Sequence, residues 1–105
     1  FVGKVGIDYT VEEGQDAART VALNIIAQVK AACNGNLDRV VRCIKLGGFV
    51  NCPDNFHQQP QVINGASDLM VDVFGDAGRH SRFAVGAPAL PFNVAVEIDA
   101  VFEVR

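Results

Sequence analysis

The first third of the chain carries apolar residues at helical spacing. Thr10 and Glu13 form the S/T-x-x-E pattern of a capping box, in which each side chain accepts a hydrogen bond from the other residue's backbone N–H. The apolar positions after them recur every three or four residues: Ala18, Val21, Ala22, Ile25, Val29, Ala32 and Cys33. Asn34 and Gly35 then tolerate the left-handed conformation in which helices often end. These features predict a helix from about Val11 to Cys33.

A second helical pattern occupies the middle of the chain. Pro60 suits the first turn of a helix, and Gly75 suits its end. The apolar positions between them are Val62, Ile63, Ala66, Leu69, Met70, Val73 and Phe74. Asn64 and Gly65 lie inside this pattern although both are poor helix formers. Either close packing at this point or a polar side chain directed at a site explains the pair, and both explanations stay open.

Three other segments have the composition of strands. Residues 39–50 (RVVRCIKLGGFV) are rich in β-branched residues, and Gly47–Gly48 indicates a bulge or a close approach there. Residues 51–60 and 75–81 are predicted loops, and a short strand begins with residues 82–85. Residues 94–104 alternate strictly, with Val94, Val96, Ile98, Ala100, Phe102 and Val104 on one face. Together the elements predict a single α+β domain, residues 1–105, with helices on one face of a sheet.

The last two predicted strands are joined by GAPALP, in which Pro88 and Pro91 favour a turn. If these strands form an antiparallel hairpin centred on that turn, Arg82 lies opposite Glu97. Such a pair is either a modest sheet stabiliser or a site for a small carboxylic acid, with Arg82 binding the carboxylate and Glu97 handling a water or a proton. The prediction depends on register, because a slip of one residue sends Glu97 to the opposite face.

Composition narrows the classes of function. Twelve acidic and nine basic residues give a net charge of -3, and the basic residues are scattered, which disfavours a nucleic-acid partner. No stretch approaches the roughly 18 consecutive apolar residues of a membrane span, so we expect a soluble protein without a membrane role. Cys33, Cys43 and Cys52 are odd in number and contain no C-x-x-C pair, which predicts buried thiols in a cytoplasmic protein and no zinc site.

Other candidates for chemistry are weaker. His57 and His80 are far apart, with no cysteine or carboxylate at ligand spacing, so we expect two solvated loop histidines and no metal. Ser67 and Ser81 have no partnered base in the sequence. The glycine-containing loop from Gly75 to His80 follows a helix instead of preceding one, which predicts a turn and not a phosphate site.

Several segments resemble one known family. They are GKVGID at 3–8, ALNIIAQVKAA at 22–32, INGASDLM at 63–70, GRHSRFAVG at 78–86 and RFAVGAPALPFNVAVEIDAVFEV at 82–104. An arginine before an apolar strand, a leucine-proline turn and a V-E-I-[DE]-A strand are typical of the YjgF/YER057c/UK114 family, also called the Rid (reactive intermediate deaminase) family. The chain is similar to a YjgF-like side branch of it.

That resemblance implies a chorismate-mutase-like α+β fold and a homotrimeric barrel with clefts between subunits. It also implies cofactor-free hydrolysis of 2-aminoacrylate-type enamines and imines to 2-keto acids and ammonia. By position, Arg82 corresponds to the residue that binds the substrate carboxylate, Glu97 to the glutamate near the attacking water, and Asn64 to an asparagine near the site. Ala84 stands at the substrate-site position where deaminases often carry cysteine, and Gly86 follows it in place of a larger residue. Family members usually have additional N-terminal strands, which we expect this chain to lack.

Three hypotheses follow for function. The first is an imine and enamine deaminase that uses Arg82 and Glu97. The second is a trimeric protein that binds or senses a small carboxylate metabolite in the same cleft without turnover. The third, the endoribonuclease L-PSP-like activity attributed to some relatives, fits poorly with an acidic chain that lacks a basic stripe.

Overall fold

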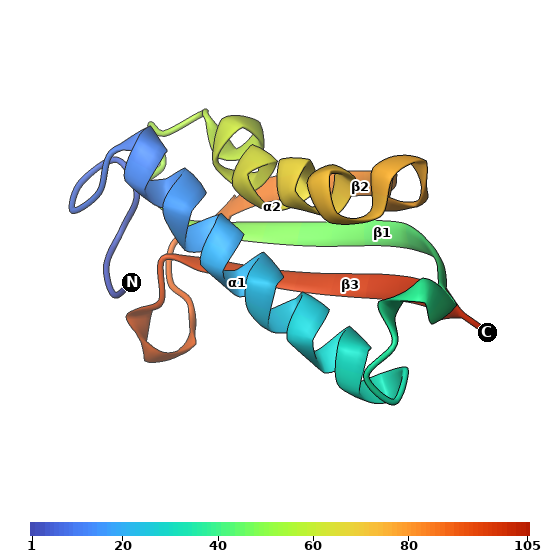
Figure 1. The fold of residues 1–105 in the computed structure, drawn as a ribbon. Coiled ribbons are helices and arrows are strands. Elements are labelled where there is room, and N and C mark those ends of the chain that lie inside the picture. Colours follow the sequence, from blue (N-terminus) through green and yellow to red (C-terminus); the bar gives the residue numbers. More distant parts are fainter.

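The computed structural model describes residues 1–105, and both helices lie on one face of a three-stranded sheet (Figure 1). The elements are α1 (Val11–Ala32), β1 (Val40–Asn51), α2 (Gln59–Phe74), β2 (Ser81–Ala87) and β3 (Val96–Val104). Short 3-10 helices precede β1 (η1, Leu37–Arg39), follow α2 (η2, Gly75–Gly78) and precede β3 (η3, Pro91–Asn93). The predicted α+β class and both predicted helices are confirmed.

Helix α1 begins and ends as its sequence signals predict. Glu13 N donates to Thr10 Oγ1 over 3.1 Å and Thr10 N donates to Glu13 Oε1 over 3.0 Å, which is the complete capping box. After the helix, Asn34 and Gly35 have φ angles of 54° and 85°, the left-handed conformation expected at this end.

Close contact between the helices explains one of the two unusual residues in α2. A Cβ at Gly65 would overlap the backbone carbonyl oxygen of Gln15 in α1. The residues that α1 buries are also small, with Ala17, Ala18 and Ala22 among them. The packing explanation therefore holds for Gly65, whereas Asn64 makes a polar contact that is described with the site.

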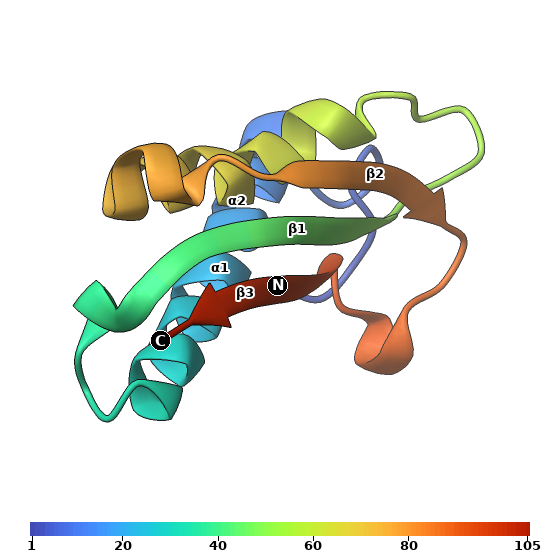
Figure 2. The same ribbon diagram turned by 90° about the vertical axis from the view of Figure 1, so that its right-hand side faces the viewer.

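Strand β1 lies in the middle of the sheet, between β2 and β3 (Figure 2). Strand β2 is parallel to β1 because α2 carries the chain back across the sheet between them, as parallel neighbours require. The chain then passes the end of the sheet, and β3 pairs antiparallel with the other edge of β1. The predicted hairpin of the last two strands is therefore wrong: Arg82 lies beside Leu46, and Glu97 lies beside Phe49.

The two faces of the sheet differ in character. Leu46 and Val50 are fully buried on the face that the helices cover. Phe49 and Phe83 pack edge to face, with ring centroids 5.4 Å apart, on the other side of the same strands. Because side chains alternate along a strand and paired residues share a face, Arg82 points to the helical side and Glu97 to the open side.

The glycine pair in β1 allows close approach from both faces. A Cβ at Gly47 would lie 2.5 Å from the Phe83 ring, and one at Gly48 would lie 2.6 Å from the Ile63 side chain. This confirms the predicted close approach. The irregularities in register fall elsewhere, between Val40 and Arg42 and between Cys43 and Lys45.

The three cysteines are all buried and unpaired, as predicted. Burial raises the pKa of the Cys43 thiol above its ordinary value of 9.0, and a backbone hydrogen bond at Lys45 and the charge of Arg42 partly oppose that rise. Neither helix combines the length and the apolar character that crossing a membrane demands.

Candidate functional site

Arg82 is held by two polar side chains of α2. Its Nη1 donates to Asn64 Oδ1 over 2.7 Å and to Ser67 Oγ over 3.2 Å. Asn64 and Ser67 are three positions apart and therefore project from one face of the helix. Asn64 therefore directs its polar side chain at Arg82, the arginine predicted for the site. Both contacts use Nη1, so the Nη2 and Nε hydrogens of the half-buried guanidinium remain available for a ligand.

Ser67 and His80 form a second pair beside Arg82. The distance from Ser67 Oγ to His80 Nε2 is 2.9 Å, and His80 Nδ1 lies 2.6 Å from the carbonyl oxygen of Gly78. Because a carbonyl only accepts, Nδ1 carries a proton, and in the neutral form of the ring Nε2 accepts from the serine hydroxyl. His80 lies in a loop as predicted, but it is half-buried and hydrogen-bonded at both ring nitrogens. Ser67 does have a base partner, contrary to prediction, and His57 is exposed as predicted.

The turn after α2 brings this histidine into place. Helix η2 folds the chain back so that Gly78 is buried against the backbone of Met70, where a Cβ would overlap the Met70 carbonyl oxygen. His80 follows two residues later and reaches Ser67, one turn before Met70 in α2. The sequence predicted this turn, but only the tertiary structure shows that it packs against Met70 and brings His80 to Ser67.

These side chains border a cavity of about 250 Å³ at the junction of α2 and β2. Its lining consists of Asn64, Ser67, Asp68, Val71, Arg79, His80 and Arg82. Two guanidinium groups face one carboxylate here, and the exposed Arg79 is paired with Asp76 over 3.3 Å. Arg82 is the cation that is fixed by neutral partners. The cavity therefore suits a small anion, and a carboxylate matches the two-pronged guanidinium.

The structure does not bring Glu97 to Arg82 within one chain. Glu97 is exposed on the open face of the sheet and belongs to β3, with β1 between it and β2. Ala84 does share the helical side of β2 with Arg82, and it is half-buried against the core beside Gly48. Of the four residues predicted for the site, Arg82 and Asn64 are in contact, Ala84 lies along the same strand face, and Glu97 is separate.

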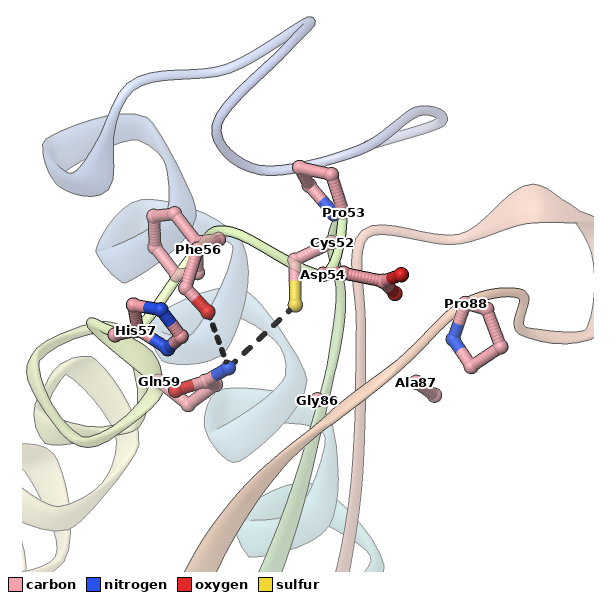
Figure 3. A pocket seen from close by; sticks show the side chains of 9 residues that line it. All are labelled: Cys52, Pro53, Asp54, Phe56, His57, Gln59, Gly86, Ala87 and Pro88. Atoms are coloured by element: carbon pink, nitrogen blue, oxygen red, sulfur yellow. Dashed lines mark hydrogen bonds between the residues drawn. The ribbon is translucent and has the colours of Figure 1, made fainter.

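A second cavity of about 250 Å³ lies where β1 and β2 end (Figure 3). Its lining consists of Cys52, Pro53, Asp54, Phe56, His57, Gln59, Gly86, Ala87 and Pro88. Gln59 Nε2 donates to the Phe56 carbonyl oxygen over 2.9 Å and lies 3.7 Å from the Cys52 thiol. Gly86 keeps this space open, since a Cβ there would lie 2.8 Å from Cys52 Sγ. No arginine or lysine lines this cavity, so the Arg82 cavity is the better site for an anion.

Comparison with known proteins identifies the family. Protein TCP17 of Trypanosoma cruzi is 52% identical over 106 residues, and the match spans this whole chain but 66% of TCP17, just under two thirds of that relative. The structure of Atu1372 from Agrobacterium tumefaciens matches with a TM-score of 0.98 and 52% identity, over 100% of this chain and 68% of that one. A structure from Shewanella oneidensis, named a putative endoribonuclease, matches with a TM-score of 0.94 and 40% identity, over 99% of this chain and 68% of that one.

The family model described as "YjgF/chorismate mutase-like, putative endoribonuclease" matches residues 1–103. This agrees with the resemblance found in the sequence and with the two helices packed on a mixed sheet. The chain belongs to the YjgF/chorismate mutase-like family.

Proposed function

We propose that this protein hydrolyses small enamine and imine intermediates of the 2-aminoacrylate type to 2-keto acids and ammonia in the Arg82 cavity. The observation that carries the proposal is the anchored arginine. Asn64 and Ser67 hold one guanidinium nitrogen at 2.7 and 3.2 Å, and the remaining N–H groups are available at a cavity of about 250 Å³. That volume accommodates a substrate of a few heavy atoms, and the arginine orients it through its carboxylate.

Hydrolysis of an imine requires little from the protein beyond orientation of the substrate and one proton-transfer group. The carbon of an imine is already electrophilic, so a water molecule can attack it once the substrate is held and one group transfers the proton. Asn64 and Ser67 contribute by fixing the direction of the guanidinium before the substrate arrives. This preorganisation lowers the entropic cost of binding in the reactive orientation.

Glu97 enters this proposal as a residue of a neighbouring subunit. In one chain its side chain and that of Arg82 point to opposite faces, with β1 between their strands. Strand β2 is a sheet edge, and the Arg82 cavity lies beside it. We propose a homotrimer in which the open face and edge of one subunit meet the β2 edge of the next, so that Glu97 approaches the water at the neighbouring Arg82.

The direct test measures ammonia release from freshly generated 2-iminopropanoate. The protein should accelerate release, and Arg82→Ala should reduce kcat/KM on the order of 10²-fold, because a charged contact to the substrate is lost. Arg19→Ala is the control, because Arg19 is an exposed arginine of α1 far from the cavity in sequence. A wild-type protein without activity, or an Arg82→Ala variant with full activity, would contradict the proposal.

The contribution of two subunits has its own test. Arg82→Ala and Glu97→Gln subunits, each with low activity alone, are unfolded together and refolded as mixed oligomers. If each site takes Arg82 from one subunit and Glu97 from another, some sites in the mixture contain both native residues, and activity returns. If both residues come from one subunit, every site keeps one defect and the mixture stays as inactive as its components.

A second candidate function is binding without turnover. Ala84 and Gly86 offer no reactive side chain on the face of β2 that Arg82 shares, which is compatible with a protein that senses a small carboxylate. In that case 2-oxobutanoate should raise the melting temperature of the wild type and not of Arg82→Ala, while ammonia release stays at the uncatalysed rate. Ribonuclease activity is not proposed, since the net charge is -3 and Lys and Arg form no stripe in the sequence.

A further inference from the structure

We propose that Ser67 transfers protons to and from the substrate in the Arg82 cavity. His80 is a positioning residue that acts through Ser67: it orients the serine hydroxyl and accepts its proton. This inference rests on the proposed function, because it concerns the same cavity and the same reaction. It adds a proton-transfer pair on the side of the sheet where Arg82 lies, which Glu97 of the same chain cannot reach.

With a neutral imidazole ring at His80, the hydrogen bonds of the pair have one consistent direction. Gly78 offers only a carbonyl to His80 Nδ1 at 2.6 Å, so Nδ1 donates and Nε2 of the neutral ring is left as an acceptor. Ser67 Oγ lies 2.9 Å from Nε2 and directs its proton to it, while the same oxygen accepts from Arg82 Nη1 at 3.2 Å. The Ser67 hydroxyl, the His80 base and the Gly78 carbonyl that orients this base are therefore in contact. This is the arrangement that activates hydroxyl groups in enzymes.

The pair is also rigidly supported. Ser67 lies in the middle of α2, and His80 follows the turn in which Gly78 packs against the Met70 backbone. The other charged groups that line the cavity are Asp68, Arg79 and Arg82, of which Arg79 is paired with Asp76. Ser67 alone contacts both the arginine that anchors the substrate and a titratable base. A carboxylate bound by Arg82 therefore places the reacting carbon next to the Ser67 hydroxyl.

The proton balance of the reaction can be written through this pair. When water attacks the imine carbon, the C–O bond forms, a proton of the water passes to Ser67 Oγ, and the serine proton passes to His80 Nε2. His80 and Ser67 then return a proton to the nitrogen of the former imine, which gives the carbinolamine. The same path then carries the carbinolamine O–H proton to the nitrogen as the C–N bond breaks, releasing the keto acid and ammonia. The pair ends each turnover in its starting state, and no further reactant is needed.

The experiment compares His80→Gln and Ser67→Ala with His57→Gln, the exposed second histidine, as the matched control. Both test variants should lower kcat about 10²-fold or more, the contribution of a general acid–base group. In His80→Gln the affinity for 2-oxobutanoate, measured by calorimetry, should change less than about threefold, whereas Ser67→Ala should also weaken binding because Arg82 loses one of its two hydrogen bonds. The dependence of kcat on pH should lose one limb in His80→Gln and keep it in His57→Gln. A purely structural role would not change the pH profile.

A spectroscopic measurement makes the pair testable without turnover. In ¹⁵N spectra of the histidine-labelled protein, His80 should be the tautomer protonated at Nδ1, and Ser67→Ala should shift only the Nε2 resonance of that ring. Protonation at Nε2 instead would overturn the pair. If the wild type is active and Arg82→Ala inactive, but His80→Gln keeps normal kcat and pH dependence, this inference fails and the proposed function stands. A wild type without turnover overturns both.

Discussion

Asn51 holds three segments of the chain together and provides the sharpest test of how the fold is stabilised. It is the fully buried polar side chain at the end of β1. Its Nδ2 donates to the Val94 carbonyl oxygen over 3.0 Å and to Asn93 Oδ1 over 3.1 Å, and its Oδ1 accepts from Lys4 Nζ over 2.8 Å. Asn51→Ala removes these three bonds and a longer one of 3.4 Å to the Gly3 carbonyl oxygen, and so weakens the attachment of β1 to the N-terminal segment and to the connector before β3.

The size of the effect follows from these contacts. Each neutral hydrogen bond contributes about 1 kcal/mol net, and a bond to a charged group contributes about 1.5–3 kcal/mol. Lys4 and Asn93 are partly or fully exposed and regain water, which keeps the sum near its lower end. We therefore expect the free energy of unfolding to fall by about 3 kcal/mol. For a domain of this size that corresponds to a melting temperature about 15 °C lower.

Urea unfolding monitored by circular dichroism measures this change, with calorimetry as an independent check. Asn24→Ala is the matched control, because Asn24 is an exposed asparagine of α1 and should change stability by less than about 0.5 kcal/mol. Asn51→Asp separates the contributions further, since it keeps the acceptor for Lys4 but loses both N–H donors. If Asn51→Ala unfolds within about 0.5 kcal/mol of the wild type, the assigned network does not stabilise the protein.

Three other perturbations test separate features. Thr10→Ala should lower the free energy of unfolding by about 1 kcal/mol in urea titrations, because the capping box is lost, and an unchanged midpoint would contradict this. Gly65→Ala should destabilise the protein by about 1–3 kcal/mol in the same assay, because the new Cβ meets the Gln15 carbonyl oxygen. Alanine is the better helix former, so a more stable variant would refute the close contact. Burial raises the pKa of Cys43, so above about pH 9 the thiol ionises first in the unfolded state and the free energy of unfolding falls with rising pH. Cys43→Ala should therefore show a shallower decline of the urea midpoint with pH than the wild type, and equal slopes would exclude this cause.

The helices could be predicted because their signals are local. The capping pair Thr10 and Glu13 and the glycine at 75 lie within a few residues of the boundaries that they determine. The alternation in residues 94–104 likewise identified β3 (Val96–Val104) and its two faces, because period two is a property of any half-buried strand. Those boundaries differ from the structure by only one or two residues.

Strand pairing could not be predicted in the same way. Residues 88–95 could close a hairpin or pass the end of the sheet, and both paths satisfy the same turn residues. The choice depends on β1, whose two edges were both open to pairing, and on α2, which places β2 parallel to it. That long-range choice put Arg82 and Glu97 on different faces and replaced the expected ion pair with contacts to Asn64 and Ser67.

The sequence by itself determined the helices, the strands and the family, because each depends on nearby residues or on a sequence signature, and that signature also made Arg82 the candidate arginine. Only the tertiary structure decided which groups meet that arginine. Ser67 faces it because one turn of α2 aligns positions 64 and 67, and His80 joins them because a glycine turn packs against Met70. Contacts between residues distant in sequence arise from packing, and no local pattern encodes them.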